Sequence, residues 1–196
     1  MSRKQHIVDA AARLFADQGF DGTTTLQIVK AAGVTEPSLY YHFKGKDDLF
    51  FQIIESTFKE YFSRLKALKK DTSTQFEKIK NLIALHFQFV EEMPDEIYLT
   101  ASTCPAKLKD PKHICTKNIK KQRKRLTSYL TECLEKGIQT NEFYTVSVPP
   151  TVSLIIAMIN GLLRQRGLKL EYMAGLKEET VEFCRRSLVK NESQPR

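Results

Sequence analysis

The sequence predicts an all-α protein, with an N-terminal three-helix helix-turn-helix domain and a larger helical domain after it, about nine helices in total. Three observations support this prediction. Apolar residues recur at helical spacing along most of the chain. Strand-like alternation is hard to find, and glycine and proline are sparse, with 8 and 7 among 196 residues. A chain of this length can bury a sizeable core, either as one domain or as a small domain joined to a larger one.

The first helix is expected at residues 3–18. Its apolar stripe consists of Ile7, Ala11, Leu14 and Phe15. Gly19 can end this helix in the left-handed conformation, and "DGTTT" then forms a loop. Thr24 is followed three residues later by Gln27, which is the capping-box pattern of a helix start. A second short helix is therefore expected to end at Gly33.

The third helix is expected at residues 36–42. Thr35 can serve as its N-cap, and Pro37 is tolerated in a first turn because the amides there lack helical partners. Two short helices joined by a turn of Gly33 and Val34 make a helix-turn-helix arrangement. The stretch "GVTEPSLYYHFKGK" is polar and aromatic with few aliphatic residues, which is not typical of a core helix.

Longer helices are predicted for the rest of the chain. They are expected at about 47–70 and 76–93, near 95–103, in a segment ending at Gly137, and at about 151–168 and 177–189. The helix at 76–93 is apolar nearly all round, which is typical of a central helix. The helix at 151–168 is apolar on almost every face. Residues 191–196 are expected to form a disordered tail.

The net charge of the chain is +8, and its distribution is uneven. Residues 106–125 hold nine Lys or Arg and one Asp, whereas the remaining chain has equal numbers of basic and acidic residues. Residues 1–46 carry six basic and four acidic residues. The basic surplus therefore sits in one mid-chain segment, and the helix-turn-helix region is nearly neutral.

Several function classes are disfavoured by what the sequence does not contain. The spacing of Cys104, His113 and Cys115 is too loose for a zinc site, so no metal and no cofactor are expected. No nucleophile triad, phosphate-binding glycine loop or recognisable carboxylate pair is found, so the chain is not expected to be an enzyme. No run of 18 apolar residues exists and the first helix contains charges, which predicts a cytoplasmic protein with no membrane span.

The stretch "TTTLQIVKAAGVTEPSLYYHFKGKDDLF", with "AARLFADQGFDGTT" before it, resembles the N-terminal domain of the TetR family of bacterial transcriptional regulators. The match is concentrated in residues 3–50. It departs from the family pattern at Val29, where Ala is common, and at Gly45, where Ser or Asn often precedes the lysine. The resemblance implies a DNA-binding domain at 1–46 and a ligand-binding and dimerisation domain at 47–190. It also implies a homodimer on palindromic double-stranded operator DNA.

The resemblance places the third helix in the major groove. Base-edge contacts are then expected from Glu36, Pro37 and Ser38, because a carboxylate can accept from a cytosine amine, a hydroxyl can donate or accept, and a proline can meet a thymine methyl. Phosphate contacts are expected from Thr24, Thr25, Tyr40, Tyr41, His42 and Lys46. Alternative roles are helix-dipole stabilisation by Glu36, packing by Tyr40 and an internal hydrogen bond for His42.

Two further sites are expected in the larger domain. The dimer interface, which the family builds from its last two helices, is expected at Ile155, Ile159, Leu162, Val181, Cys184 and Leu188, and some of these could instead face the monomer core. An effector that releases the operator is expected among His86, Phe89, Met93, Tyr98, Tyr129, Asn160 and Arg164. The effector is expected to be small and largely apolar, or anionic.

The basic run at 107–125 admits three interpretations. It is a solvated surface, a clamp for an anionic effector such as an acyl-CoA, or a source of long-range attraction to DNA. An alternative for the whole larger domain is that it binds a protein partner instead of a metabolite. The leading hypothesis is a ligand-responsive repressor.

Overall fold

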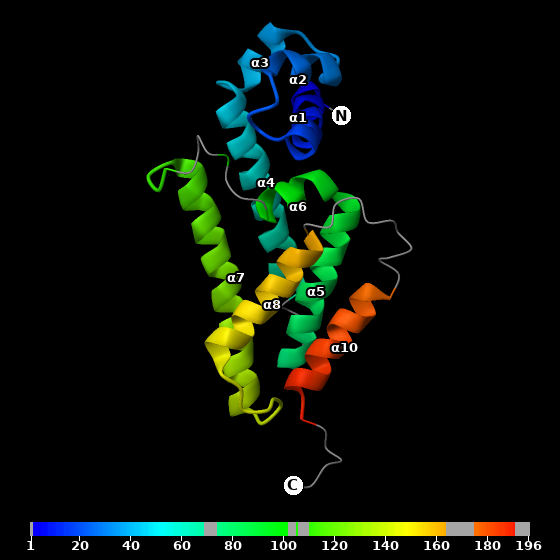
Figure 1. Ribbon diagram of the computed structural model, residues 1–196, viewed down its shortest axis with the longest axis vertical. Coiled ribbons are helices and arrows are strands. Elements are labelled where there is room, and N and C mark those ends of the chain that lie inside the picture. Colours follow the sequence, from blue (N-terminus) through cyan, green and yellow to red (C-terminus); the bar gives the residue numbers. More distant parts are fainter. Residues whose placement is uncertain (1, 69–73, 102–104, 106–109, 164–174, 191–196) are drawn as a thin grey trace. The chain divides into compact units, whose positions relative to one another are not determined.

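The computed structural model describes residues 2–68, 74–101, 105, 110–163 and 175–190, with only the backbone described at 162 and 163. The chain divides into two compact units. The first unit comprises residues 1–60 and 93–122, and the second comprises residues 61–92 and 123–196. In the part of the chain that is described there are nine helices and no strand (Figure 1). The all-α prediction is therefore confirmed, whereas the predicted domain boundary after residue 46 stays a prediction.

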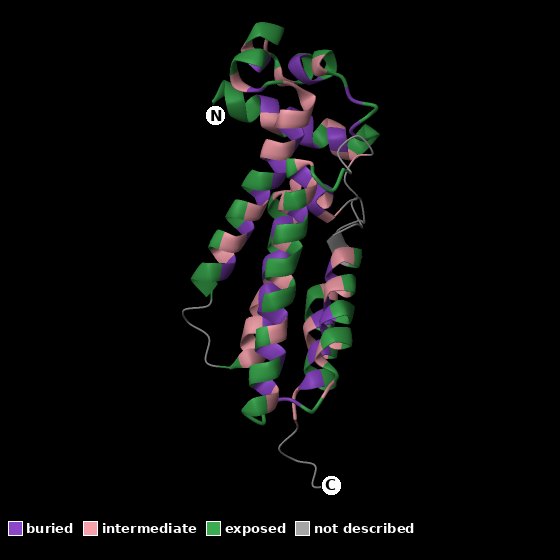
Figure 2. Ribbon diagram, turned by 90° about the vertical axis from the view of Figure 1, so that its left-hand side faces the viewer, coloured by how far each residue is buried: buried purple, intermediate pink, exposed green. Residues whose placement is uncertain are grey.

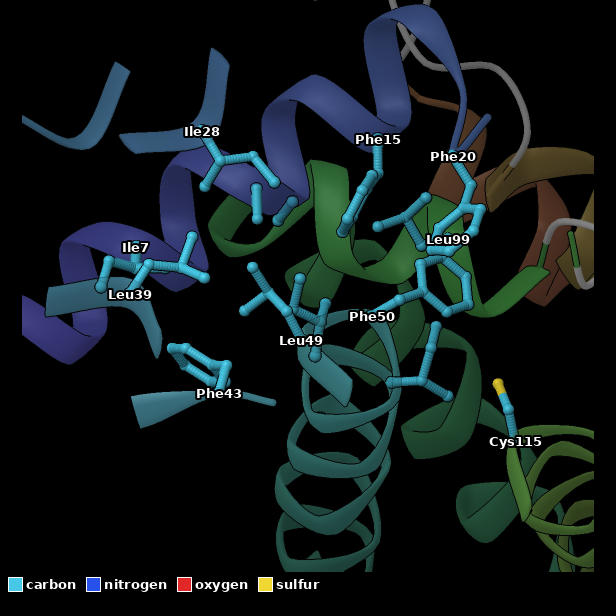
Figure 3. Close-up of a cluster of buried hydrophobic side chains, with 14 of the residues drawn as sticks. Ile7, Phe15, Phe20, Ile28, Leu39, Phe43, Leu49, Phe50, Leu99 and Cys115 are labelled. Atoms are coloured by element: carbon cyan, nitrogen blue, oxygen red, sulfur yellow. The ribbon is translucent and has the colours of Figure 1, made fainter. Parts of the chain in front are cut away.

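The first unit contains the three N-terminal helices and parts of later ones. These are α1 (Arg3–Gln18), α2 (Thr25–Ala32), α3 (Glu36–His42), the start of α4 (Lys46–Leu68), α6 (Pro94–Ala101) and the start of α7 (Ile114–Gln139). Their apolar faces meet in one core that includes Ile7, Phe15, Ile28, Leu39, Phe43, Leu49 and Phe50 (Figure 3). Phe20 joins this core from the loop after α1, with its ring centroid 5.3 Å from that of Phe50. Burial of these side chains stabilises the short helices α2 and α3, which would be only marginally stable as isolated helices.

The second unit is built around α5 (Gln75–Glu92). This helix is flanked by α8 (Val148–Leu163) and α10 (Leu176–Leu188), and the remainders of α4 and α7 complete the unit (Figure 1). The buried residues of α5 are Ile79, Leu82, Ile83, Leu85, His86, Phe87 and Phe89. Buried positions occur on more than one face of this helix, so other elements cover it from several sides. Figure 2 shows that buried positions recur along the helices of the structure. The prediction that it is a central helix is confirmed.

A loop after α7 fastens three helix ends of the second unit together. Glu142 accepts hydrogen bonds from the amides of Gln75 (2.8 Å) and Phe76 (2.7 Å), which lie in the first turn of α5. Tyr144 donates its amide to Leu188 O at the end of α10 (2.8 Å). These are groups that a helix end leaves without partners, so a residue distant in sequence completes the caps.

The predicted helix bounds are confirmed for α1 and α3 and lie within a few residues for α5 and α10. The predicted end of α7 at Gly137 is wrong, because α7 continues to Gln139. Gly137 instead makes room for Phe143, whose amide donates to Gly137 O over 2.9 Å. Helix α8 begins at Val148, before the predicted start at 151, since two prolines fit a first turn. The predicted tail at 191–196 lies outside the described residues.

Candidate nucleic-acid interface and effector region

The start of α2 carries the predicted capping box. Gln27 donates its amide to Thr24 Oγ1 (3.2 Å), and the Gln27 side chain accepts from the Thr24 amide (2.8 Å). Thr24 is exposed and Thr25, the first helical residue, is half-buried. A helix start of this kind presents amide donors and the positive end of the helix dipole, which suits a phosphate group.

The turn between α2 and α3 depends on one glycine. Gly33 has φ 64°, a left-handed conformation that favours glycine, and Val34 donates its amide to Val29 O (3.0 Å). Thr35 occupies the N-cap position of α3, as predicted, and its side chain makes no cap hydrogen bond. Leu39 and Phe43 are buried and anchor α3 to the core.

The outer face of α3 is exposed and aromatic. Glu36 and Pro37 are exposed and Ser38 is half-buried. Tyr40 is 54% exposed and Tyr41 is 84% exposed, and the ring of half-buried His42 stands edge-on to Tyr41 at 4.9 Å. Leu26 on α2 is also exposed, at 65%, and sequence reasoning missed it. Large apolar surface in water is costly, so this face has the character of a binding surface.

Lys46 has partners that sequence reasoning did not foresee. Its Nζ donates to Phe20 O (2.7 Å) and to Thr23 O (2.9 Å), and lies 4.4 Å from the centroid of the Phe20 ring. The ammonium group therefore joins the first turn of α4 to the loop between α1 and α2. Its phosphate contact stays a prediction, as do those of the other residues of this interface.

A cleft of about 430 Å³ lies on another side of the first unit. It is lined by side chains of α1, α2 and α6, among them His6, Asp9, Arg13, Asp95 and Glu96. Burial raises the pKa of Glu96, and the negative charges of Asp95 and Asp9 raise it further. This mixed and partly acidic surface is a poor match for phosphates, which leaves the face of α2 and α3 as the better nucleic-acid interface.

The effector candidates separate into two groups. His86 and Phe89 are buried in the second unit beside Tyr61, whose hydroxyl is 3.2 Å from His86 Nδ1, while Met93 and Tyr98 are half-buried parts of the first unit. Burial lowers the pKa of His86 to about 4, so its ring is neutral at pH 7. Burial also raises the pKa of Tyr61 well above its ordinary value. Sequence reasoning missed Tyr61, because it recurs with Phe50, Ile54 and Leu65 at the helical spacing of ordinary core residues.

The other candidates lie apart from this pair or outside the described residues. Tyr129 donates its hydroxyl to Lys78 O (3.3 Å) and lines a cavity of about 120 Å³ with Cys133. A site for a small-molecule ligand usually has several hundred Å³, so this cavity alone is too small for an effector. Asn160 is half-buried on α8, and Arg164 lies outside the described residues.

Four residues predicted for the dimer interface are buried within one chain. They are Ile155, Ile159, Cys184 and Leu188, whereas Val181 is half-buried and the side chain of Leu162 is not described. The large apolar side chains that α8 and α10 expose are instead Leu154, at 71%, and Phe183, at 59%. The interface role of the six predicted residues stays a prediction.

The basic segment is a helical surface where it is described. Lys117, Lys120, Lys121 and Lys124 are exposed on α7 at helical spacing, and no Asp or Glu occurs between residues 114 and 131. The guanidinium of Arg125 lies 3.8 Å from the centroid of the Phe62 ring. A lysine row without acidic neighbours repels itself along the helix, so an anionic partner would relieve it.

The described cysteines take part in no disulfide and in no candidate metal site. Cys115, Cys133 and Cys184 are buried and form no disulfide, and burial raises the pKa of Cys184 to about 11. Cys104 lies outside the described residues. The described residues contain no group of His, Cys, Asp and Glu that could hold a metal ion. Within the same residues, no helix is long and apolar enough to cross a membrane.

Comparisons with known proteins agree with this architecture. Residues 7–53 match the family model of the bacterial regulatory proteins of the tetR family. The HTH-type transcriptional repressor KstR2 of Mycobacterium tuberculosis is 25% identical over 138 residues, which are 69% of this chain and 68% of the repressor. Its solved structure has a TM-score of 0.86 at 19% identity and covers 97% of this chain and 96% of that chain.

Two other solved structures share the fold at lower TM-scores. The regulator FadR from Bacillus subtilis, in complex with stearoyl-CoA, has a TM-score of 0.71 at 22% identity and covers 91% of this chain and 96% of that chain. AibR, in complex with isovaleryl coenzyme A and operator DNA, has a TM-score of 0.74 at 19% identity and covers 93% of this chain and 97% of that chain. Residues 7–53 therefore form an N-terminal domain of the tetR family of bacterial regulatory proteins, and the chain as a whole shares the fold of these regulators.

Proposed function

We propose that this chain is a cytoplasmic transcriptional regulator, not an enzyme, and that it represses by binding an operator through α2 and α3. The observation that carries the proposal is the exposed face of α3, where Tyr40 and Tyr41 stand outward beside a rigidly capped α2. Phenolic hydroxyls can donate to phosphate oxygens, and the first turn of α3 can meet base edges. KstR2, which is similar in sequence and fold, is a repressor, and this supports repression over activation.

The operator-binding form is proposed to be a homodimer. Helix α8 contains no charged residue, yet Leu154, Ala157 and Gly161 are exposed along one side of it at helical spacing. A helix face that is uncharged and exposed in one chain needs a cover, and small residues allow a second helix to approach closely. Phe183 of α10 extends this apolar surface with a second large side chain. A second copy of the chain would cover this surface, and the resulting dimer would present two helix-turn-helix regions to a palindromic operator.

Selection from a random-sequence duplex library by the full-length protein tests DNA binding. We expect enrichment of a palindromic sequence and a dissociation constant that depends only moderately on salt. Residues 1–46, the DNA-binding head, have two more basic than acidic residues in each copy, so few phosphates are neutralised. A slope of log K against log salt of about −10 would contradict this interpretation of the interface. Failure to enrich any sequence would contradict the proposed function itself.

The effector is proposed to be a coenzyme A thioester. FadR and AibR were solved with such molecules, and the lysine row on α7 supplies cations for their phosphates. The Nδ2 of Asn118, on the same helix, is buried without a hydrogen-bond partner in the described structure, so it has a donor to offer. An acyl thioester also combines the apolar and anionic characters expected of the effector.

A thermal-shift series separates the effector hypotheses. Acyl-CoAs of increasing chain length are compared with free coenzyme A and with the free fatty acids, and compounds that raise Tm are tested for operator release. The triple variant Lys120→Glu, Lys121→Glu and Arg123→Glu should lose the shift, whereas Lys59→Glu with Lys66→Glu on exposed α4 positions should keep it. Unchanged ligand affinity in the triple variant would exclude the clamp. No shift with any thioester would instead favour a protein partner.

A further inference from the structure

Lys46 lies where a phosphate contact is expected, but its ammonium is occupied within the protein. It donates to Phe20 O over 2.7 Å and to Thr23 O over 2.9 Å. Both acceptors are backbone carbonyls of the loop between α1 and α2, and the ring of Phe20 lies 4.4 Å from the same nitrogen. A half-buried ammonium held by two carbonyls and an aromatic face is already well solvated by the protein.

The loop that receives Lys46 is also tied from its other side. Thr23 is buried, and its hydroxyl donates to Gly19 O over 2.7 Å. Gln18 donates its Nε2 to Thr23 Oγ1 and to Gln27 Oε1, at 3.3 Å and 3.2 Å. The chain then enters the capping box of α2 at the next residue, Thr24. A shift of Thr23 O is therefore passed directly to the first turn of α2.

We infer that Lys46 is a positioning residue, whose ammonium links the first turn of α4 to the start of α2 and thereby orients the phosphate-binding amides of α2. This inference rests on the proposed DNA-binding function and assigns Lys46 a role different from a direct phosphate contact. Any movement of α4 along its axis would pull on Phe20 O and Thr23 O and so change the angle at which α2 meets the DNA backbone.

The two roles make opposite predictions about salt. A lysine that contacts phosphate releases counterions, so its removal from both copies of a dimer flattens the slope of log K against log salt by about 1.8. A lysine that only orients amides leaves the slope nearly unchanged while the affinity falls. The two roles also differ for arginine, which keeps the charge but presents a planar fork where a compact ammonium is needed.

The experiment uses the full-length protein and a duplex that the wild-type protein has selected from a random-sequence library. Dissociation constants are measured over a series of KCl concentrations for the wild type, Lys46→Met, Lys46→Arg and Lys44→Met. Lys44 is an exposed lysine two residues before Lys46, so its variant measures how the loss of one nearby positive charge changes affinity and salt slope. We expect Lys46→Met and Lys46→Arg to bind about tenfold more weakly, with a slope within about 0.3 of the wild type.

Hydrogen exchange provides a readout that does not depend on DNA. In the unbound protein, Lys46→Met should speed the exchange of amides in residues 20–27 about tenfold, while amides of α5 keep their wild-type rates. A slope flattened by about 1.8, full affinity in Lys46→Arg, or unchanged exchange at 20–27 would overturn the inference. If the wild type selects no duplex, the proposed function fails, and the exchange rates still decide whether Lys46 holds the loop.

Discussion

The ring of Phe143 lies directly against Gly137, inside the last turns of α7. A methyl group at position 137 would overlap this ring and stand 2.8 Å from Phe143 Cγ. The same two residues are joined by the hydrogen bond from the Phe143 amide to Gly137 O. The glycine is therefore required by a side chain that arrives from the following loop, and not by the end of the helix.

Gly137→Ala should lower the free energy of unfolding despite the better helix propensity of alanine. The propensity gain is about 1 kcal/mol, whereas forcing a methyl group into a packed ring costs about 2–3 kcal/mol, so a net loss of about 1–2 kcal/mol is expected. Urea denaturation followed by circular dichroism measures it. In the background of Phe143→Leu, which makes room, the same change should cost much less. Equal costs in both backgrounds would mean that the ring is not the obstacle.

Glu142 should contribute to stability from a position distant in sequence from the helix it caps. Its carboxylate accepts from the amides of Gln75 and Phe76, so Glu142→Ala leaves two first-turn donors of α5 without this partner. A loss of about 1–2 kcal/mol is expected from urea denaturation. Glu135→Ala, at an exposed carboxylate on α7, is the control and should change stability by less than about 0.5 kcal/mol. Similar effects at both positions would argue against capping.

The helix starts and stops of the first unit could be read from sequence because their causes are local. Local residues alone predict both ends of α2, because the capping box of Thr24 and Gln27 and the left-handed Gly33 involve only positions a few residues apart. The same holds for α3, whose bounds follow from a proline in its first turn and from the residues around it. These features do not depend on what the rest of the chain does.

The features that sequence reasoning missed depend on contacts between residues far apart in the chain. Gly137 looked like a helix end because its partner, Phe143, approaches only in the folded state. The internal partners of Lys46 were missed because the carbonyls that hold it belong to a loop more than twenty residues earlier. Periodicity found the apolar faces of α8 and α10, but it could not say which side of each helix the monomer core would use. Ile155 and Leu154, adjacent in sequence, have opposite burial.

Stability should fall as the pH is lowered from about 6.5 to about 4 because of His86. Burial lowers its pKa from 6.5 to about 4, so in this range the unfolded chain binds a proton that the folded chain does not. The stabilisation is present above pH 6.5 and is lost as the pH falls, by up to about 3 kcal/mol. Urea midpoints of wild type and His86→Phe across this range measure it. The phenylalanine variant loses the contact with Tyr61 but should show a flatter pH dependence.

A different pH response would identify another group as the dominant one. Glu96 has a raised pKa because of burial, so its contribution has the opposite sign and favours the folded state as the pH falls. Glu96→Gln should therefore steepen the acid loss slightly, whereas His86→Phe should remove most of it. An unchanged acid loss in His86→Phe would contradict the assignment to His86.

Tyr41→Phe should weaken operator binding without destabilising the protein. The side chain is 84% exposed, so loss of its hydroxyl removes no internal hydrogen bond that holds the fold. One phosphate hydrogen bond lost in each copy of a dimer predicts about a tenfold weaker Kd at fixed salt. Fluorescence anisotropy with the selected duplex measures it, and the salt slope should not change because no cation is removed. Tyr144→Phe, an exposed tyrosine of the second unit, is the control and should bind normally.

Leu154→Glu should convert the proposed homodimer into a folded monomer. The side chain is 71% exposed in one chain, so the carboxylate is tolerated in the monomer but would be buried without a partner between two copies. Light scattering after size exclusion measures the mass, and circular dichroism confirms the helix content. Ile114→Glu, at a 60% exposed apolar residue at the start of α7, is the matched control and should remain a dimer. Because two heads must bind one palindrome, Leu154→Glu should also lose operator affinity while Tyr40 and Tyr41 are intact. A variant that stays dimeric would place the interface on a surface other than the outer side of α8.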